Sequence, residues 1–179
     1  TYDNGMVFIP NKELMGSYAA MMKKEESLGY VYRLANASSQ MLQATLAGDT
    51  ETMAKIIQYA HNTEVPILSY NNETKLSAII NLVYLAARDQ YRVEREDKAG
   101  KGYVDFIFYP IRHDQDCMIL ELKVDYKPEE AIAQIKEKEY ALRFKGKTAE
   151  RKEYTGRILA VGISYNSKTK EHECKIEQL

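Results

Sequence analysis

Two strand-like hydrophobic runs of this chain each carry an acidic residue in the middle. Residues 103–109 contain Asp105, and residues 118–124 contain Glu121, which is followed two positions later by Lys123. An ionised carboxylate within an apolar strand is costly unless it is paired or binds a cation. Two such acids in successive strands therefore suggest that they share one cation.

The alternation of side chains along a strand sorts these residues by face. Glu121 and Lys123 share one face of their strand, and the apolar residues that alternate with them occupy the other. If the two strands pair, Asp105 and Glu121 can converge on one ion. Mg²⁺ suits this arrangement, because it prefers oxygen ligands and needs only one or two protein carboxylates beside substrate phosphates. We therefore predict an Mg²⁺ site at which Mn²⁺ could substitute.

Such a site has the parts that phosphodiester hydrolysis needs. A bound metal ion polarises a phosphoryl oxygen and lowers the pKa of a water molecule, and Lys123 is placed to hold the attacking water or to neutralise charge at phosphorus. The plain alternative is a cross-strand ion pair on a half-exposed sheet face, where such pairs contribute little. The tripeptide is not specific, because a carboxylate two before a lysine recurs elsewhere, for example at Glu173 and Lys175. Only the copy at Glu121 lies within an apolar strand.

Composition excludes several other classes of protein. The chain has 179 residues and a formal net charge of -1, which argues against an electrostatic grip on nucleic acid over its whole surface. Cys117 and Cys174 lack metal-ligand spacing, so we expect neither a zinc site nor a disulfide framework, and a cytoplasmic location. No stretch resembles a signal peptide or a membrane span. Because the chain begins with Thr1 rather than methionine, we expect it to be a piece of a longer protein.

Residues 1–70 have a helical pattern and form a predicted helical lobe. Asn11 can cap a helix that runs through Glu26, Gly48 can end a second helix, and Asp49 or Thr50 can cap a third. Turn-forming residues within 63–72 interrupt the helical periodicity. We therefore predict a domain boundary there and a second domain over residues 71–179.

The pattern of the second domain predicts the order helix, strand, strand, strand, helix, strand. Its first helix begins at Glu73 and has an apolar stripe at helical spacing, made by Leu76, Ile79, Ile80, Val83 and Ala87. An edge strand over 92–96 and a turn over 97–102 should precede the strand at 103–109. The final strand is predicted over residues 157–165.

The second helix of this domain is predicted to begin at Pro128 and to end at Gly146. Its apolar face would contain Ala131, Ile135 and Leu142. The strand face opposite Glu121 and Lys123 is apolar and this helix must pack somewhere, so we expect the charged face to line a cleft or to face solvent.

Three segments then follow one another in a recognisable order. They are residues 102–105 ending in Asp105, residues 119–124 containing Glu121 and Lys123, and residues 133–136 containing Gln134. In this order the chain resembles the PD-(D/E)XK nuclease superfamily from Glu73 to about residue 165. More narrowly, it resembles the bacterial group in which such a domain follows an AAA-ATPase-like domain. The resemblance implies an α/β fold with a restriction-endonuclease-like α/β/α core, a mixed sheet flanked by helices, which the small helical lobe precedes as a connector.

The resemblance also implies roles for the matching residues. Asp105 and Glu121 would bind the metal ion, Lys123 would be the catalytic lysine, and Gln134 would orient the site. The chain departs from the superfamily's name in having no proline before Asp105. It also has no phosphate-binding loop of the G-x-x-x-x-G-K-[ST] form, so an ATPase domain would lie outside it.

Two further metal ligands are implied by the same resemblance. Glu73, at the start of the first core helix, matches an acidic residue that some members use, and the backbone carbonyl of Leu122 would complete the set. For Glu73, a simple first-turn acid favoured by the helix dipole explains the sequence equally well.

The leading prediction is thus a metal-dependent nuclease acting on nucleic acid, DNA rather than RNA, with an N-terminal AAA-ATPase-like domain as its partner. The alternative is a catalytically silent nuclease fold that binds nucleic acid or docks to the ATPase domain. A third, weaker hypothesis makes residues 1–70 a platform for protein interactions.

Several other features have two interpretations. Between residues 136 and 157 there are eight Lys or Arg against four Glu, which indicates either a phosphate-contact surface or a solvated helix end. Tyr103, Tyr109 and Tyr140 could stack on bases, although packing with a bonded hydroxyl is the commoner use. The three histidines have no ligand spacing, and we expect them at the surface.

Overall fold

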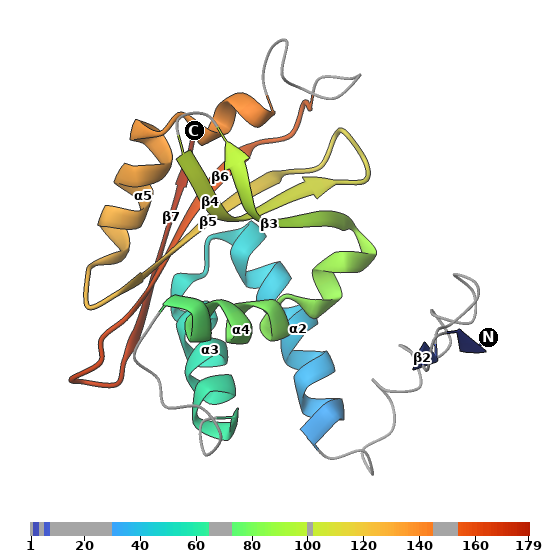
Figure 1. Ribbon diagram of the computed structural model, residues 1–179, viewed down its shortest axis with the longest axis vertical. Coiled ribbons are helices and arrows are strands. Elements are labelled where there is room, and N and C mark those ends of the chain that lie inside the picture. Colours follow the sequence, from blue (N-terminus) through green and yellow to red (C-terminus); the bar gives the residue numbers. More distant parts are fainter. Residues whose placement is uncertain (1, 4–5, 8–29, 65–72, 100–101, 145–153) are drawn as a thin grey trace.

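The computed structural model describes residues 2–3, 6–7, 30–64, 73–99, 102–144 and 154–179. Its centre is a mixed sheet of five strands in the order β3-β4-β5-β6-β7 (Figure 1). The strands are β3 (Tyr91–Ala99), β4 (Gly102–Pro110), β5 (Cys117–Val124), β6 (Ile158–Tyr165) and β7 (His172–Gln178). Only β5 and β6 are parallel, and the other neighbours are antiparallel. Two short strands near the N-terminus, β1 (Tyr2–Asp3) and β2 (Met6–Val7), pair with each other.

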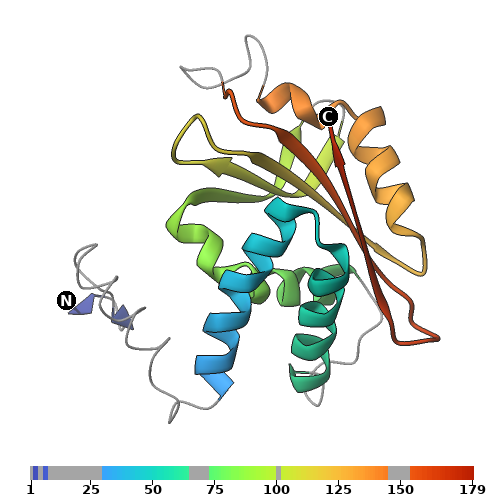
Figure 2. The ribbon, with the colours of Figure 1, turned by 180° about the vertical axis from the view of Figure 1, so that it is seen from behind.

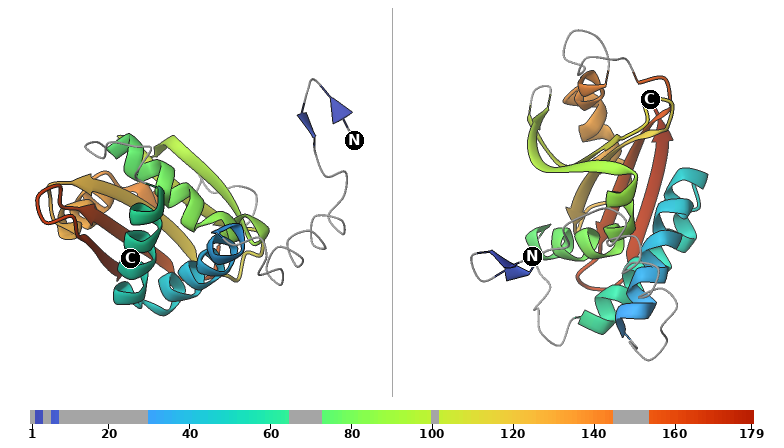
Figure 3. Two further views of the ribbon diagram at one scale, coloured as in Figure 1. Left: turned by 90° about the horizontal axis from the view of Figure 1, so that it is seen from below. Right: turned by 90° about the vertical axis from the view of Figure 1, so that its right-hand side faces the viewer.

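Helices cover both faces of this sheet (Figures 2 and 3). One face packs against α2 (Tyr30–Ala47), α3 (Thr50–Glu64), α4 (Glu73–Val83) and the 3-10 turn η3 (Leu85–Asp89). The other packs against α5 (Pro128–Glu137) and the 3-10 turn η4 (Tyr140–Arg143). The chain is therefore an α/β protein with the predicted α/β/α layering.

Alternation along β5 assigns its side chains to the two layers. Leu120 and Leu122 belong to the core beneath α2, α3 and α4, whereas Cys117 and Ile119 belong to the core beneath α5. Glu121 continues the second series, so it lies on the α5 face.

The predicted helix signals of the central segment are confirmed. All five residues of the apolar stripe that begins at Leu76 are buried. Gly48 ends α2 with a positive φ of 77°, a conformation that glycine adopts without penalty. Asp49 caps α3, because its Oδ1 accepts the N–H of Thr52 at 3.0 Å. The helix predicted from Asn11 to Glu26 lies outside the described residues.

The helices of residues 30–64 pack directly on the sheet. Met41, Met53 and Ile57 are fully buried in the same hydrophobic core as Leu120 and Val161. The predicted boundary near 63–72 falls largely outside the described residues, so the division into domains 1–70 and 71–179 stays a prediction.

Two element boundaries and one strand differ from the prediction. The predicted turn at 97–102 is wrong, because β3 continues to Ala99, which pairs with Gly102 across a two-residue connection. The second helix ends at Glu137 rather than at Gly146, since Glu139 adopts a left-handed conformation with φ of 57°. Leu142, predicted on the apolar face, is consequently 47% exposed. The strand β7 was not predicted at all.

A glycine of β6 lets α5 approach the sheet closely. A Cβ atom on Gly162 would lie 2.3 Å from the carbonyl oxygen of Pro128, the first residue of α5. In the parallel ladder Gly162 is the partner of Glu121 on β5. Because Gly162 has no side chain, α5 can lie directly against β6, next to the position of Glu121 on β5.

Candidate active site

The carboxylate of Asp105 is fixed against the backbone of β5. The ladder between β4 and β5 pairs Phe106 with Leu120, so Asp105 comes next to Glu121 in the same register. The N–H of Leu122 donates to Oδ2 of Asp105 at 2.8 Å. Since the N–H and C=O of one residue in an extended strand point to the same side, the carbonyl of Leu122 also points toward β4.

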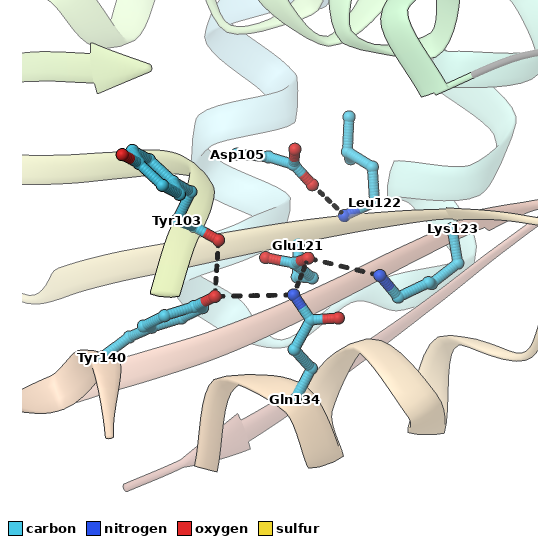
Figure 4. Close-up of polar contacts among 7 residues, drawn as sticks. All are labelled: Tyr103, Asp105, Glu121, Leu122, Lys123, Gln134 and Tyr140. Carbon is cyan, nitrogen blue, oxygen red and sulfur yellow. Dashed lines mark hydrogen bonds and ion pairs between the residues drawn. The ribbon is translucent and has the colours of Figure 1, made fainter. Parts of the chain in front are cut away.

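Glu121 is the centre of the polar cluster drawn in Figure 4. Its side chain is only 5% exposed, and its Oε1 lies 3.3 Å from Nζ of Lys123. The same Oε1 accepts a hydrogen bond from Nε2 of Gln134, which reaches down from α5. Three of the predicted residues are thus in direct contact, and Asp105 lies beside them on the neighbouring strand.

The environment of Glu121 opposes an uncompensated negative charge. Burial, together with the negative charge of the nearby Asp105, raises the pKa of this carboxyl from its usual 4.5 to about 7, against the opposing effect of Lys123. Its second oxygen, Oε2, is buried and has no hydrogen-bond partner among the residues that the structure describes. A buried, unpartnered carboxylate oxygen beside a second carboxylate suits a divalent cation, which supplies the missing positive charge and ligand bond.

A buried tyrosine connects the site to both flanking elements. Tyr140, from η4, is 1% exposed and donates its hydroxyl hydrogen to the carbonyl oxygen of Tyr103 on β4. Nε2 of Gln134 lies 3.5 Å from the same hydroxyl. Tyr140 therefore ties α5 to the strand of Asp105. Of the two uses that the sequence allowed for Tyr140, the structure shows packing with a bonded hydroxyl rather than an exposed ring for stacking.

A groove opens beside the cluster. It has a volume of about 480 Å³, and Lys123 and Gln134 belong to its lining. The remaining lining residues are Tyr126 in the loop before α5, Glu130, Ala133 and Glu137 on α5, and Lys138 directly after it. The groove thus connects Lys123 of β5 and Gln134 of α5 to solvent.

The further ligand Glu73 is only partly described. It is the first residue of α4, as predicted, but its side chain lies outside the described residues. Within the described part of the chain no group of three or more His, Cys, Asp or Glu side chains gathers as a metal site would. The role of Glu73 stays a prediction.

Comparison with protein families identifies the fold. The family model of the PD-(D/E)XK nuclease superfamily matches residues 71–174, more than half of the chain. The chain belongs to the PD-(D/E)XK nuclease superfamily. No curated protein and no solved structure matches it. The match confirms the resemblance to the superfamily and the restriction-endonuclease-like fold class.

The superfamily match spans the described site. Asp105, Glu121, Lys123 and Gln134 all lie within the matched residues. Members of the superfamily act on nucleic acid and generally use divalent metal ions. The match begins at residue 71 and includes none of the lobe at 1–70.

The described basic residues between 136 and 157 mostly pair with acids. Three of them form ion pairs with acids on other elements: Lys136 with Glu177, Arg143 with Glu94, and Arg157 with Asp116. Residues 145–153 lie outside the description. The described part of this run therefore fits structural pairing better than a free phosphate-contact surface.

Two of the three histidines are not at the surface, so that prediction is wrong for them. His61 and His172 are 4% and 7% exposed and contact each other between α3 and β7.

Cys117 and Cys174 are both free. Within the described part of the chain, none of the helices has the length and apolar character that crossing a bilayer requires.

Proposed function

We propose that this chain is an Mg²⁺-dependent nuclease domain that hydrolyses phosphodiester bonds, with DNA as its preferred substrate and Mn²⁺ as an alternative ion. The observation that carries the proposal is the buried Glu121, whose Oε2 lacks a described partner although its carboxyl lies beside Asp105. Burying an ionised carboxylate costs desolvation free energy, and a bound cation offsets this cost. Membership of the superfamily gives the reaction class.

The residues have separate roles in this proposal. Asp105 and Glu121 hold the metal ion, together with the carbonyl of Leu122 and with Glu73. When bound, the ion polarises the scissile phosphate and lowers the pKa of a water molecule. Lys123, whose side chain is 17% exposed, reaches the reacting phosphate from the protein side and neutralises charge that develops there.

Gln134 acts through Glu121. Its hydrogen bond to Oε1 fixes the orientation of the carboxylate and leaves Oε2 for the ion. Residues that orient ligands in this way change metal affinity or activity by about 10- to 100-fold when they are removed.

The wider setting of the domain rests on the sequence resemblance alone. We propose that residues 1–70 connect the nuclease domain to an N-terminal AAA-ATPase-like domain and that the protein works in the cytoplasm. The two free cysteines fit a reducing compartment.

Cleavage assays test the proposal. The chain is incubated with single-stranded and double-stranded DNA and RNA in the presence of Mg²⁺ or Mn²⁺. We expect cleavage by the wild type, none by Asp105→Ala, and full cleavage by the control Asp114→Ala, which changes an exposed aspartate paired with Arg112 in the turn after β4. Cleavage by the wild type that does not exceed that of Asp105→Ala would contradict the proposal.

One observation favours the alternative of a silent nuclease fold. The described residues provide two carboxylates at the site rather than a cluster of three. A silent domain would bind nucleic acid without cutting it under any metal condition of the assay, and Asp105→Ala would then bind as the wild type does.

A further inference from the structure

The groove beside the catalytic cluster contains one exposed aromatic ring. Tyr126, in the loop between β5 and α5, is 60% exposed and lines the groove together with Lys123 and Gln134. Its ring makes no aromatic or cation-π contact with another described residue. The exposed ring face is therefore available to a ligand that enters the groove.

The backbone on both sides of Tyr126 is held in place. Asp125, in a left-handed conformation, accepts hydrogen bonds from the N–H and the hydroxyl of Ser167 at 2.7 and 2.8 Å. The N–H of Lys127 donates to Oε1 of Glu130 at 3.2 Å, as the start of α5 requires. Tyr126 is thus exposed on an anchored loop, and its ring is presented to the groove by a fixed backbone.

The charge of the groove indicates which part of a nucleotide it can accept. Its lining contains two lysines, Lys123 and Lys138, and two glutamates, Glu130 and Glu137. A lining without net charge gives no preference for a phosphate, but it suits an uncharged base. The volume of about 480 Å³ falls within the range of small-molecule sites and can hold a flat ring on top of Tyr126.

We propose that this groove binds an unpaired base of the substrate, stacked on Tyr126, next to the phosphate that Lys123 contacts. A base within a duplex is already stacked and paired, so it cannot enter. The domain therefore selects single-stranded segments over continuous duplex. This inference rests on the proposed function, which places the phosphate at Lys123, but it concerns the contact of the base with Tyr126.

Binding without catalysis tests the inference. The probe is a short fluorescein-labelled DNA oligonucleotide of mixed sequence, measured by anisotropy in a chelator as single strand, as the same sequence in RNA, and as duplex. Removing one stacking ring weakens single-strand binding by about 5- to 100-fold. We expect Tyr126→Ala to show this loss on both single strands and to leave duplex binding within about twofold of the wild type.

Two variants serve as controls. Tyr126→Phe keeps the ring and should bind the single strand as the wild type does, because stacking does not need the hydroxyl. Tyr59→Ala removes a tyrosine of similar exposure, 43%, from α3 on the other face of the sheet, and should leave binding unchanged. Because the Tyr126 side chain is mostly exposed, its removal should not alter the thermal unfolding temperature.

The outcomes separate this inference from the proposed function. Equal single-strand binding by wild type and Tyr126→Ala, an equal loss on duplex, or no nucleic-acid binding by the wild type would overturn the stacking role. Failure of the wild type to cleave any substrate, with the Tyr126 effect on binding intact, would overturn the proposed function and leave the stacking role standing.

Discussion

Two buried titratable clusters lie on opposite faces of the sheet, and their hydrogen bonding differs. On the helix α3 side, Nδ1 of His61 lies 3.1 Å from Nε2 of His172, and Nδ1 of His172 lies 2.8 Å from Oε1 of Gln58. On the α5 side, Glu121 uses one oxygen twice, while the other has no described partner. Burial of an ionisable group alone does not indicate a functional site, whereas an unmatched buried oxygen does.

The histidine cluster is matched when both rings are neutral. The amide oxygen of Gln58 can only accept, so Nδ1 of His172 carries its hydrogen and Nε2 accepts from His61. Burial lowers the pKa of His172 to about 3, and it also lowers the pKa of His61, with the Lys170 charge contributing. This cluster is therefore a stable packing arrangement that needs no further ligand.

The largest expected effect is a difference between Glu121 and Glu173, two strand glutamates that each precede a lysine by two positions. We expect Glu121→Gln to lower the cleavage rate by about 10³-fold, because it removes a metal-binding charge. Glu173→Gln is the matched control, since Glu173 occupies the equivalent position before Lys175 in the exposed strand β7. Single-turnover cleavage at saturating Mg²⁺ measures both, and equal rates for the two variants would show that the motif at Glu121 has no special role.

Removing the unmatched charge should stabilise the metal-free protein. Because the folded state keeps the Glu121 proton up to a pKa of about 7 and the unfolded chain releases it near 4.5, stability is lost as pH rises through this range. Above it, Glu121→Gln should raise the free energy of unfolding by about 1–3 kcal/mol. Urea denaturation in a chelator measures the gap between variant and wild type, which should vanish at acidic pH. A variant less stable than the wild type at alkaline pH would contradict this account of the site.

The histidine cluster should respond to pH in the opposite direction. The pKa of His172 in the folded state, about 3, lies below its usual 6.5, so its contribution is present above pH 6.5 and is lost as pH falls toward 3. Between pH 6.5 and pH 3, the free energy of unfolding of His172→Gln should therefore fall by about 1–3 kcal/mol less than that of the wild type. Urea denaturation at several pH values tests this. An identical pH dependence in the two proteins would mean that the pair does not resist protonation.

The smallest expected effect concerns Tyr140. Tyr140→Phe removes only the hydroxyl that contacts the Tyr103 carbonyl and Gln134, so we expect a decrease in kcat of up to about tenfold with KM unchanged. The same substitution at Tyr84, whose hydroxyl bonds Thr45 in the core on the other face of the sheet, should alter stability but not kcat. A change in KM alone would place Tyr140 in substrate binding instead.

The sequence predicted the elements whose signals are local. The apolar stripe of α4, the glycine that ends α2 and the Asp49 cap all depend on residues a few positions apart, and all are found. The acids of β4 and β5 were predictable for a related reason, because a charge inside an apolar strand is conspicuous without knowledge of the fold.

The missed features depend on tertiary contacts. The strand β7 is half-exposed, and its charged residues hide the alternation, so only its pairing with β6 reveals it. The early end of α5 depends on the left-handed conformation of Glu139, and the sequence has no glycine or proline there that would predict it. The burial of His61 and His172 depends on contact between residues far apart in sequence. Tyr140 belongs to the site because η4 folds back onto β4.

Direct measurement of metal binding tests the central claim that Asp105 and Glu121 share a divalent cation. Mn²⁺ is titrated calorimetrically into the wild type, Glu121→Gln and Glu173→Gln at slightly alkaline pH. We expect the wild type and Glu173→Gln to bind the ion at a site that Glu121→Gln lacks. Equal Mn²⁺ binding by all three proteins, or none by the wild type, would contradict the account.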